Sequence, residues 1–368
     1  MKYDVLIVGG GPTGSATARR LSGAGYRVAV MEEHSEIGIP VSCAGLVTGR
    51  VLEIAGIKDV IMNKIRGAYV HSPGGGEIKI GGDRTHAFVI DREMFDKEMA
   101  EMAISEGAEY LFKRKFSDAN KKDGKIVISG KDSIECRSLV GADGARSRVA
   151  ECFDFPGVRE YVYAMQTVVP YDTEDEFVDI FLGKDIAPGF FAWIIPEGRR
   201  ARIGLGVGEG HNLKEYFRKF LKMLDVKEGE KNAGVIPLGM RGKLSEGNIF
   251  LVGDAAGQVK ATSGGGIYPG LVGAKVLASS IQEFMDGGNC SYRREYMAEF
   301  GKELKKSMFF RKLFLKAEDK KIDAIFDSID ANIIKTINDY GDIDYPSRLA
   351  KEIVKKHTKL LKFLFLPF

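Results

Sequence analysis

The sequence predicts an α/β fold with three parts: a parallel-sheet domain assembled from separated segments, an antiparallel β-sheet domain and a helical C-terminal region. Three observations lead to this prediction. A glycine-rich turn follows an apolar run near the N-terminus, a second apolar run ends in Gly253 and Asp254, and alternating strands fill residues 162–207. The 368 residues are enough to bury a sizeable interior without disulfide bonds.

The first predicted unit is a strand, a helix and a strand. Residues 3–10, YDVLIVGG, are a continuous apolar run typical of a buried parallel strand, and residues 12–26 begin with proline and end near glycine, as helices do. Between them Gly9, Gly11 and Gly14 form the motif G-x-G-x-x-G. A Cβ at these positions would prevent the tight turn, the close approach of a pyrophosphate to the backbone, and the close packing of helix on strand. The strand at 27–33 holds Glu32, placed to accept ribose hydroxyls. This unit is Rossmann-like.

The remaining elements follow from pattern and turn signals. Residues 58–88 contain short strands and hairpin turns, 91–107 a helix, and 138–144 a buried strand that ends in Asp143 and glycine. Residues 248–257 return to the first domain and 268–285 form a helix behind it. We expect the nucleotide-binding domain to comprise 1–66, 86–150 and 245–290, the sheet domain 67–85 and 151–244, and the helical region 291–368.

Composition excludes several classes of protein. A net charge of +3 from 54 basic and 51 acidic side chains predicts no nucleic-acid partner. The four cysteines are far apart, with no C-x-x-C and no paired histidine, so no metal site is predicted. The N-terminus shows no signal-peptide pattern and no run reaches the ~18 apolar residues of a membrane span. We expect a cytoplasmic protein that lies at most on the inner surface of a membrane.

Asp254 bears on the choice between a nicotinamide and a flavin nucleotide. A simple NAD-dependent dehydrogenase has no obvious use for an acid at this distant strand end, whereas extended FAD has a polyol that needs an acceptor beside the pyrophosphate. Gly265, Gly266 and Ile267 begin the next helix, where backbone N–H groups would meet the flavin ring. The alternative role of Asp254 is a helix N-cap. Its combination with the glycine motif and Glu32 favours FAD.

Roughly residues 1–290 resemble the FAD flavoproteins of the para-hydroxybenzoate hydroxylase type. The resemblance rests on four motifs that occur in the order of that superfamily: the glycine motif, IDREMFD with Arg92, GADGARSRV with Asp143, and VGDAAG with Asp254. Within that superfamily the sequence is most similar to the geranylgeranyl reductases, especially the archaeal digeranylgeranylglycerophospholipid reductases. EIGIPVSCAG resembles their cysteine-bearing segment and SGGGIYPG their flavin-side loop. FAWIIP, followed by seven residues and GLG, resembles their Y-x-W-x-F-P-x(7-8)-G-x-G signature, with Phe191 for Tyr and Ile195 for Phe.

The resemblance implies an FAD-dependent reductase that saturates isoprenoid C=C bonds of geranylgeranyl chains in membrane ether lipids, with hydride from flavin N5. Cys43 and Tyr268 are the two candidate proton donors, and the sequence does not choose between them. Phe191, Trp193 and Pro196 are expected to line the substrate cavity. The expected FAD contacts are Gly9, Gly11, Gly14, Ser15, Glu32, Cys43, Ala44, Gly45, Arg92, Phe116, Asp143, Asp254, Gly265, Gly266 and Ile267.

Partners and rival functions follow from what else the sequence holds. No second G-x-G-x-x-G precedes a helix, so the expected electron donor is ferredoxin, another reduced carrier or a transient NAD(P)H. Residues 351–368 interleave lysines with apolar residues, which predicts either a helix on an anionic membrane or one docked by its apolar face. The rival function is an aromatic monooxygenase or halogenase, although Phe191 replaces the first Trp of the halogenase W-x-W-x-I-P pattern. A non-catalytic flavin-binding or electron-transfer module would leave the second sheet without a purpose.

Overall fold

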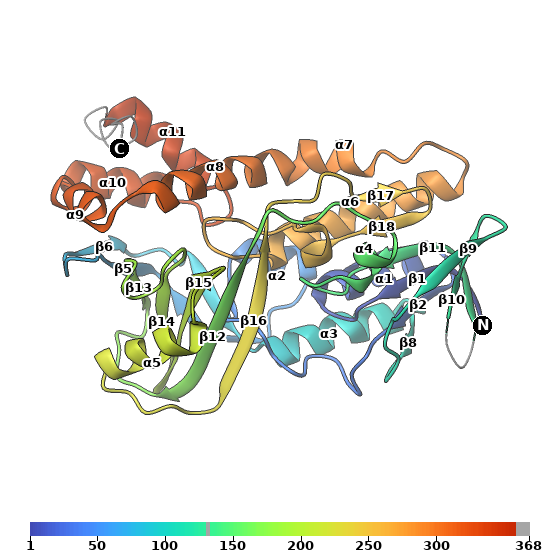
Figure 1. The fold of residues 1–368 in the computed structure, drawn as a ribbon, viewed down its shortest axis with the longest axis horizontal. Helices are drawn as coiled ribbons and strands as arrows, with labels where there is room; N and C mark the ends of the chain where they lie inside the picture. The colour runs from blue at the N-terminus through green and yellow to red at the C-terminus, as the bar shows by residue number, and fades with distance from the viewer. Residues whose placement is uncertain (130–132, 358–368) are drawn as a thin grey trace.

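The computed structural model describes residues 1–129 and 133–357. Two large sheets lie side by side and a row of C-terminal helices runs along one edge of both, as the ribbon shows (Figure 1). This mixed α/β architecture confirms the predicted fold class.

The first sheet is mainly parallel and carries the N-terminal turn. Its central strands pair in parallel, with Val5 opposite Val28 on one side and Ser138 on the other. The helices α1 (Pro12–Gly23), α3 (Arg92–Ser105) and α6 (Ile267–Met285) pack around it, and a β9 (Ala119–Lys122) and β10 (Lys125–Ile128) hairpin extends it. Its strand order is β17 (Ser245–Glu246), β18 (Ile249–Leu251), β11 (Ile134–Gly141), β1 (Lys2–Val8), β2 (Val28–Met31) and β8 (Glu109–Leu111).

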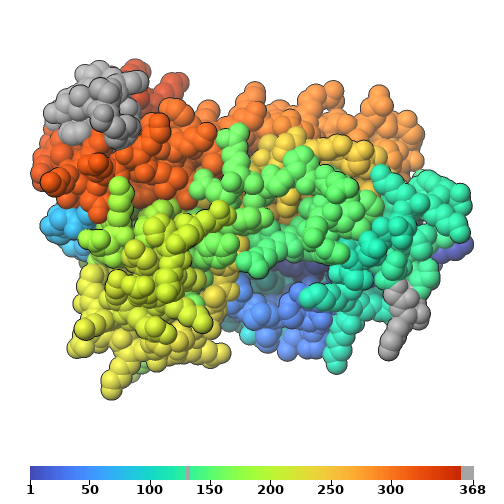
Figure 2. Space-filling model, viewed as in Figure 1, coloured from blue at the N-terminus to red at the C-terminus, as the bar shows by residue number. Residues whose placement is uncertain are grey.

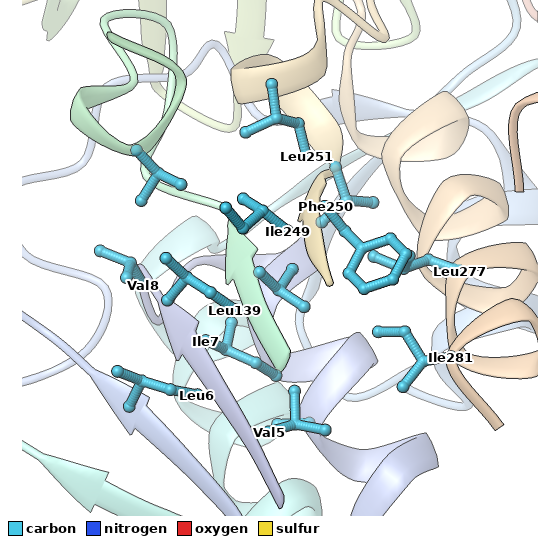
Figure 3. Close-up of a cluster of buried hydrophobic side chains, with 14 of the residues drawn as sticks. Val5, Leu6, Ile7, Val8, Leu139, Ile249, Phe250, Leu251, Leu277 and Ile281 are labelled. Carbon is cyan, nitrogen blue, oxygen red and sulfur yellow. The ribbon is translucent and has the colours of Figure 1, made fainter. Parts of the chain in front are cut away.

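The core of this domain is formed by strands that are buried on both faces. Residues 5–8 of β1 are at most 5% exposed, which explains the unbroken apolar run. Phe250 of β18 lies beside Leu277 and Ile281 of α6 in the close-up (Figure 3). Each such side chain contributes about 1.5–3 kcal/mol when it leaves water, so strand segments far apart in sequence are held together by this shared core.

The second sheet is antiparallel apart from one pair of strands. The predicted strands of 162–207 are present, and β16 (Lys231–Leu238), which the sequence analysis did not identify, adds an edge. The parallel pair is β13 with β5. Helix α5 (Leu213–Met223) packs on the sheet through Phe217 and Phe220. The strand order is β16, β12 (Glu160–Pro170), β15 (Arg200–Gly208), β14 (Ala192–Glu197), β13 (Phe177–Phe181), β5 (Gly67–His71) and β6 (Glu77–Gly81).

Shorter elements connect the two sheets. A third sheet has the order β3 (Leu46–Val47), β7 (Ala87–Ile90) and β4 (Ile61–Ile65). Helix α2 (Gly49–Ala55) follows β3, α4 (Arg148–Cys152) follows β11, and a 3-10 turn, Gly253–Ala256, follows β18. The chain therefore passes repeatedly between the domains, and the domain boundaries stated above remain a prediction.

The C-terminal region is helical, as expected. It contains α7 (Tyr292–Tyr296), a π-helical turn (Met297–Gly301), α8 (Lys302–Lys316), α9 (Asp319–Asp327), α10 (Ala331–Tyr340) and α11 (Pro346–Lys356). These helices, orange and red, form the upper rim of the molecule (Figure 2). A partly buried ion pair, Arg311 Nη2 to Glu160 Oε2 at 2.9 Å, attaches α8 to β12. Residues 358–368 of the predicted basic tail lie outside the described residues.

None of the helices in the described ranges has the length and apolar character needed to cross a membrane.

Candidate active site

One continuous cavity of about 1000 Å³ extends from the glycine turn of the first sheet to the aromatic strand of the second. Gly11 and Glu32 line one part of it, Asp254 lies on its wall, and Phe191 and Trp193 line another part. The structure therefore brings the N-terminal turn, the β18 end and the second sheet around a single space, which the sequence analysis required of them.

The three glycines of the turn have different physical roles. Gly9 has φ of 100°, and a Cβ there would lie 2.4 Å from the Ala142 carbonyl oxygen. A Cβ on Gly14 would lie 2.0 Å from the Gly9 carbonyl oxygen, so this glycine permits close packing of α1 on β1. Gly11, by contrast, has no atom within 4 Å of its Cβ position. It precedes α1, whose first N–H groups have no side-chain cap, and this arrangement suits a pyrophosphate.

Glu32 lies at the end of β2, where its carboxylate is 8% exposed and lines the cavity. Its Oε2 accepts a hydrogen bond from the Gly10 N–H at 2.8 Å, and its Oε1 accepts one from the His34 N–H at 3.0 Å. The Ser15 hydroxyl donates to the Gly10 carbonyl at 2.9 Å and accepts from Tyr110. Ser15 does not line the cavity. Ser15 therefore stabilises the turn through its hydrogen bond to Gly10. Glu32, which lines the cavity, is placed to bind an adenosine ribose.

Asp254 lies in the 3-10 turn after β18, and its carboxylate faces the cavity. Burial raises the pKa of this carboxyl to about 6, an effect partly opposed by the charge of Arg92. No group in residues 1–129 or 133–357 donates a hydrogen bond to its side chain, and it caps no helix in this part of the chain. A Cβ on Gly266 would lie 2.7 Å from Asp254 Oδ1. An unsatisfied carboxylate beside a glycine loop suits the hydroxyl-rich polyol of FAD, so the residues present fit this cofactor.

Arg92 starts α3 and lines the cavity as a fixed positive charge. Its guanidinium forms a bidentate pair with Asp96, with both Nη2 to oxygen distances at 2.9 Å. Burial lowers the pKa of Arg92, but its interactions with Cys43 and Asp96 outweigh burial and hold that pKa above its ordinary value. Cys43 therefore lies beside a permanent cation on the cavity wall, and its Sγ accepts the Gly45 N–H at 3.3 Å.

The Cys43 loop is anchored by the second sheet. Gln166 Nε2 donates to the Cys43 carbonyl oxygen at 2.8 Å, and Arg202 Nη1 donates to that of Ala44 at 2.8 Å. Arg202 also pairs with Glu197 Oε2 at 2.7 Å. Neither anchor is predicted by a motif in the sequence. The one signal in the sequence is the charge of Arg202 between the apolar residues Ala201 and Ile203 of β15, and its side chain is only 7% exposed in the structure.

Aromatic side chains line the cavity at the second sheet. Phe191 stacks on Phe190 with centroids 4.2 Å apart and meets Trp193 edge-on at 6.0 Å. Trp193 is paired with Gly204 of β15, where a Cβ would lie 2.6 Å from the indole. A Cβ on Gly206 would likewise lie 2.6 Å from the Phe190 ring. The G-x-G of the signature thus leaves room for the aromatic rings, a physical reason that the sequence analysis did not supply.

Four further predicted residues lie on the cavity wall. The carboxylate of Asp143 accepts from the Ser147 hydroxyl at 2.6 Å and the Val149 N–H at 3.0 Å, so both of its oxygens hold the start of α4. Phe116 is 5% exposed in the core of the first sheet. Gly265 and Ile267 flank the α6 N-terminus. Asp143 and Phe116 thus shape the wall while they serve the fold.

Besides Gly14 and Ser15 of the turn, two predicted residues, Tyr268 and Pro196, do not line the cavity. The Tyr268 hydroxyl lies 3.2 Å from the Tyr345 hydroxyl and its ring packs edge-on against Phe300. Pro196 lies near the end of β14, and its carbonyl accepts from Asn63 at 3.2 Å. Of the two candidate proton donors, therefore, Cys43 lines the cavity and Tyr268 does not.

The chain is similar in sequence to known reductases. Residues 160–240 match the family model "Geranylgeranyl reductase catalytic domain" and residues 4–170 match "Lycopene cyclase protein". The chain is 33% identical to an uncharacterized protein of Methanocaldococcus jannaschii, over 96% of this chain and 95% of that protein. It is 29% identical to digeranylgeranylglycerophospholipid reductase 2 of Methanothermobacter thermautotrophicus, over 95% and 98% of the two chains.

Solved structures share the fold. A geranylgeranyl bacteriochlorophyll reductase-like protein from Thermoplasma acidophilum superposes with a TM-score of 0.86, at 24% identity over 99% of this chain and 98% of that one. The p-nitrophenol 4-monooxygenase of Pseudomonas putida gives a TM-score of 0.66, at 19% identity over 98% of both chains. At these identities the superpositions establish the architecture, which reductases and oxygenases have in common.

Proposed function

From the premise that this chain belongs to the geranylgeranyl reductase family of FAD-dependent oxidoreductases, we propose that it saturates the C=C bonds of geranylgeranyl chains in membrane ether lipids. One observation carries the proposal: the cavity that begins at the nucleotide turn continues, without a wall between, into a chamber lined by Phe191 and Trp193. A long apolar chain needs such a chamber directly beside the redox cofactor.

When bound, FAD supplies a hydride to one alkene carbon. The chain's own residues hold and orient the reactants. Gly11 and the α1 N-terminus would receive the pyrophosphate, Asp254 the polyol, and the α6 N-terminus at Gly266 the edge of the ring, where its dipole favours negative charge.

The chamber would bind an apolar substrate and exclude water from it. Phe190, Trp193 and Ile195 are at most 7% exposed and belong to one apolar cluster. Each buried CH₂ of a prenyl chain contributes about 0.8 kcal/mol, so even one isoprene unit gains several kcal/mol from this lining. Exclusion of water protects the reduced cofactor and fixes the alkene in one geometry.

The second alkene carbon needs a proton, and we propose that Cys43 donates it. The thiol lies on the cavity wall, and the Arg92 guanidinium beside it would stabilise the thiolate that remains. Asp96 holds Arg92 in place through two hydrogen bonds of 2.9 Å. The thiolate then recovers a proton from water, which completes addition of one hydride and one proton across the double bond.

We further propose a position on the inner face of the cell membrane, which suits a lipid substrate. Helix α8 carries Lys305, Phe309, Lys312 and Lys316 at a helical spacing of four, three and four residues. All four are exposed, with Phe309 at 57%. Helix α11, which contains residues 351–356 of the predicted basic tail, packs on α8 and α10. Basic side chains around an exposed aromatic ring suit an anionic lipid surface.

The electron donor would be ferredoxin, another reduced carrier or NAD(P)H. The described chain has one glycine-rich dinucleotide turn, and FAD would occupy it. A nicotinamide donor would therefore have to bind transiently.

The decisive experiment loads the protein with FAD, reduces it with dithionite without O₂, and adds a digeranylgeranyl ether lipid. Mass spectrometry should show a gain of two hydrogens for each double bond reduced. Cys43→Ala should lose most of this activity and keep its FAD, whereas Cys152→Ala, a partly exposed cysteine outside the cavity, should retain both. A hydroxylated or halogenated aromatic product formed with O₂ would instead establish the rival monooxygenase or halogenase function.

A further inference from the structure

Lys260 is a buried cation that neither the sequence motifs nor the proposed mechanism uses. The residue is 4% exposed, yet it lines the cavity together with the flavin-side loop. Its Nζ would lie 3.3 Å from a Cβ on Gly265, and its backbone closes this loop by accepting the Gly264 N–H at 2.8 Å. The ammonium is therefore located at the loop that precedes α6.

The contacts of Lys260 with its partners leave one N–H donor of its ammonium group available to a ligand. Its Nζ donates to Asp344 Oδ1 at 2.6 Å and to the Ile343 carbonyl oxygen at 3.1 Å. An ammonium has three N–H donors, and within the described residues these two contacts account for two of them. The third is free to meet a ligand in the cavity that Lys260 lines.

Asp344 does not neutralise Lys260 completely, because its other oxygen serves different groups. Asp344 Oδ2 accepts from the Thr48 hydroxyl at 2.6 Å and from Arg50 Nη1 at 3.2 Å. Asp342 pairs with Arg50 and Arg348. The cluster therefore combines three cations, Lys260, Arg50 and Arg348, with two carboxylates, and Lys260 is its member on the cavity wall.

We propose that Lys260, held by Asp344, supplies the positive charge that favours the reduced, anionic form of the flavin in this site. Two-electron reduction with uptake of one proton leaves a negative charge on the pyrimidine part of the isoalloxazine ring. A buried ammonium acts on that charge in a low-dielectric surrounding, where electrostatic effects are stronger than in water. The α6 N-terminus acts in the same direction.

This inference rests on FAD binding and is independent of which alkene is reduced. It also gives the C-terminal region a part in redox chemistry, since Asp344 lies between α10 and α11 and binds Lys260, which lines a cavity formed largely by the first 270 residues. Asp344 is a positioning residue in this account, because it acts through Lys260.

The test is a spectrophotometric redox titration of the full-length, FAD-loaded protein without lipid. Lys260→Met removes the cation but keeps the length of the side chain, and it should lower the ratio of reduced to oxidised flavin at a fixed potential at least tenfold. This corresponds to a midpoint about 30 mV more negative for a two-electron couple. Asp344→Asn removes the counter-charge but keeps an amide oxygen that can still accept from Lys260, so it should shift the midpoint in the opposite direction.

Midpoint shifts of opposite sign in these two variants would not arise if Lys260 and Asp344 had a purely structural role. Lys275→Met makes the same change at an exposed position of α6 and should leave the midpoint unchanged. Shifts of the same sign in Lys260→Met and Asp344→Asn, or no shift in either, would overturn the proposal. If Lys260→Met does not fold with FAD, a midpoint in Asp344→Asn that fails to rise overturns it alone. Failure of lipid reduction by the wild type, with these shifts intact, would refute only the proposed substrate.

Discussion

Arg202 Nη1 donates a hydrogen bond of 2.8 Å to the backbone carbonyl oxygen of Ala44. This contact joins β15 of the second sheet to the loop that carries Cys43. A Cβ on Gly45 would lie 2.0 Å from the same guanidinium, so glycine at that position is a condition of the contact. The backbone of the loop that carries the proposed proton donor is therefore held by the second sheet, although the loop follows the first sheet's β2 in sequence.

Replacing Arg202 should uncouple this loop while the nucleotide turn stays intact. Arg202→Met leaves Glu197 without its partner and frees two carbonyl oxygens, so we expect the free energy of unfolding to fall by about 3 kcal/mol. Turnover should fall at least tenfold with FAD still bound. Denaturant titration and anaerobic assay check this, with exposed Arg200→Met as the control. Wild-type turnover in Arg202→Met would show that the loop needs no such anchor.

Asp254 should cost the apo-protein stability at neutral pH because burial raises its pKa to about 6. The unfolded carboxyl ionises near pH 3.9, so this penalty is absent below about pH 4, grows as pH rises through about 4–6, and is complete above that window. A difference of about two pKa units corresponds to about 3 kcal/mol at most. Asp254→Asn should therefore make the apo-protein more stable than the wild type at pH 8, with the difference shrinking toward pH 4.

The same substitution should weaken FAD binding, since an amide is a poorer acceptor for polyol hydroxyls than a carboxylate. We expect about a tenfold to hundredfold rise in Kd. Denaturation of the apo-protein at both pH values and FAD titration measure the two effects, with the exposed Asp185→Asn as control. Equal stability of wild type and Asp254→Asn at pH 8 would contradict the raised pKa.

The fold could be predicted well where one local signal decides it. A continuous apolar run next to a G-x-G-x-x-G turn, as in β1, predicts a parallel strand that is buried on both faces. The edge strand β16 was harder, because half-exposed residues such as Asn232 and Gly234 give little alternation. Residues 231–238 form a strand because they pair with β12, and this pairing is not visible in their own sequence pattern.

The site was predictable only as far as motifs reach. The glycine turn and Asp254 stand in recognisable patterns, whereas Lys260 and Arg202 act through carbonyls and carboxylates that are distant in sequence. Tyr268 illustrates the converse. It lies within the SGGGIYPG segment, yet helix geometry directs its ring toward Tyr345, and it does not line the cavity. Spacing along a helix start does not fix which side chain faces a ligand.

Phe191→Ser should affect the lipid and not the cofactor. The ring lines the chamber and stacks on Phe190 at 4.2 Å, and its loss removes about 1.5–3 kcal/mol of apolar contact with the chain. We expect KM to rise roughly tenfold to hundredfold, with unchanged FAD content. Phe112→Ser is the control, because Phe112 is 38% exposed and does not line the cavity. Loss of FAD from Phe191→Ser would place the aromatic wall in the cofactor site.

Membrane binding should depend on the exposed side of α8. Replacing Lys305, Lys312 and Lys316 with Gln removes three basic side chains, each contributing about 1 kcal/mol near an anionic surface. Co-sedimentation with phosphatidylglycerol vesicles should therefore weaken about a hundredfold, as it should for the wild type at high salt. Phe309→Ser should weaken binding further with little effect of salt. The control replaces Lys214, Lys219 and Lys222 of α5, which are exposed on a helix that packs on the second sheet. Equal loss in both triple variants would mean that net charge, and not this helix, attracts the protein to lipid.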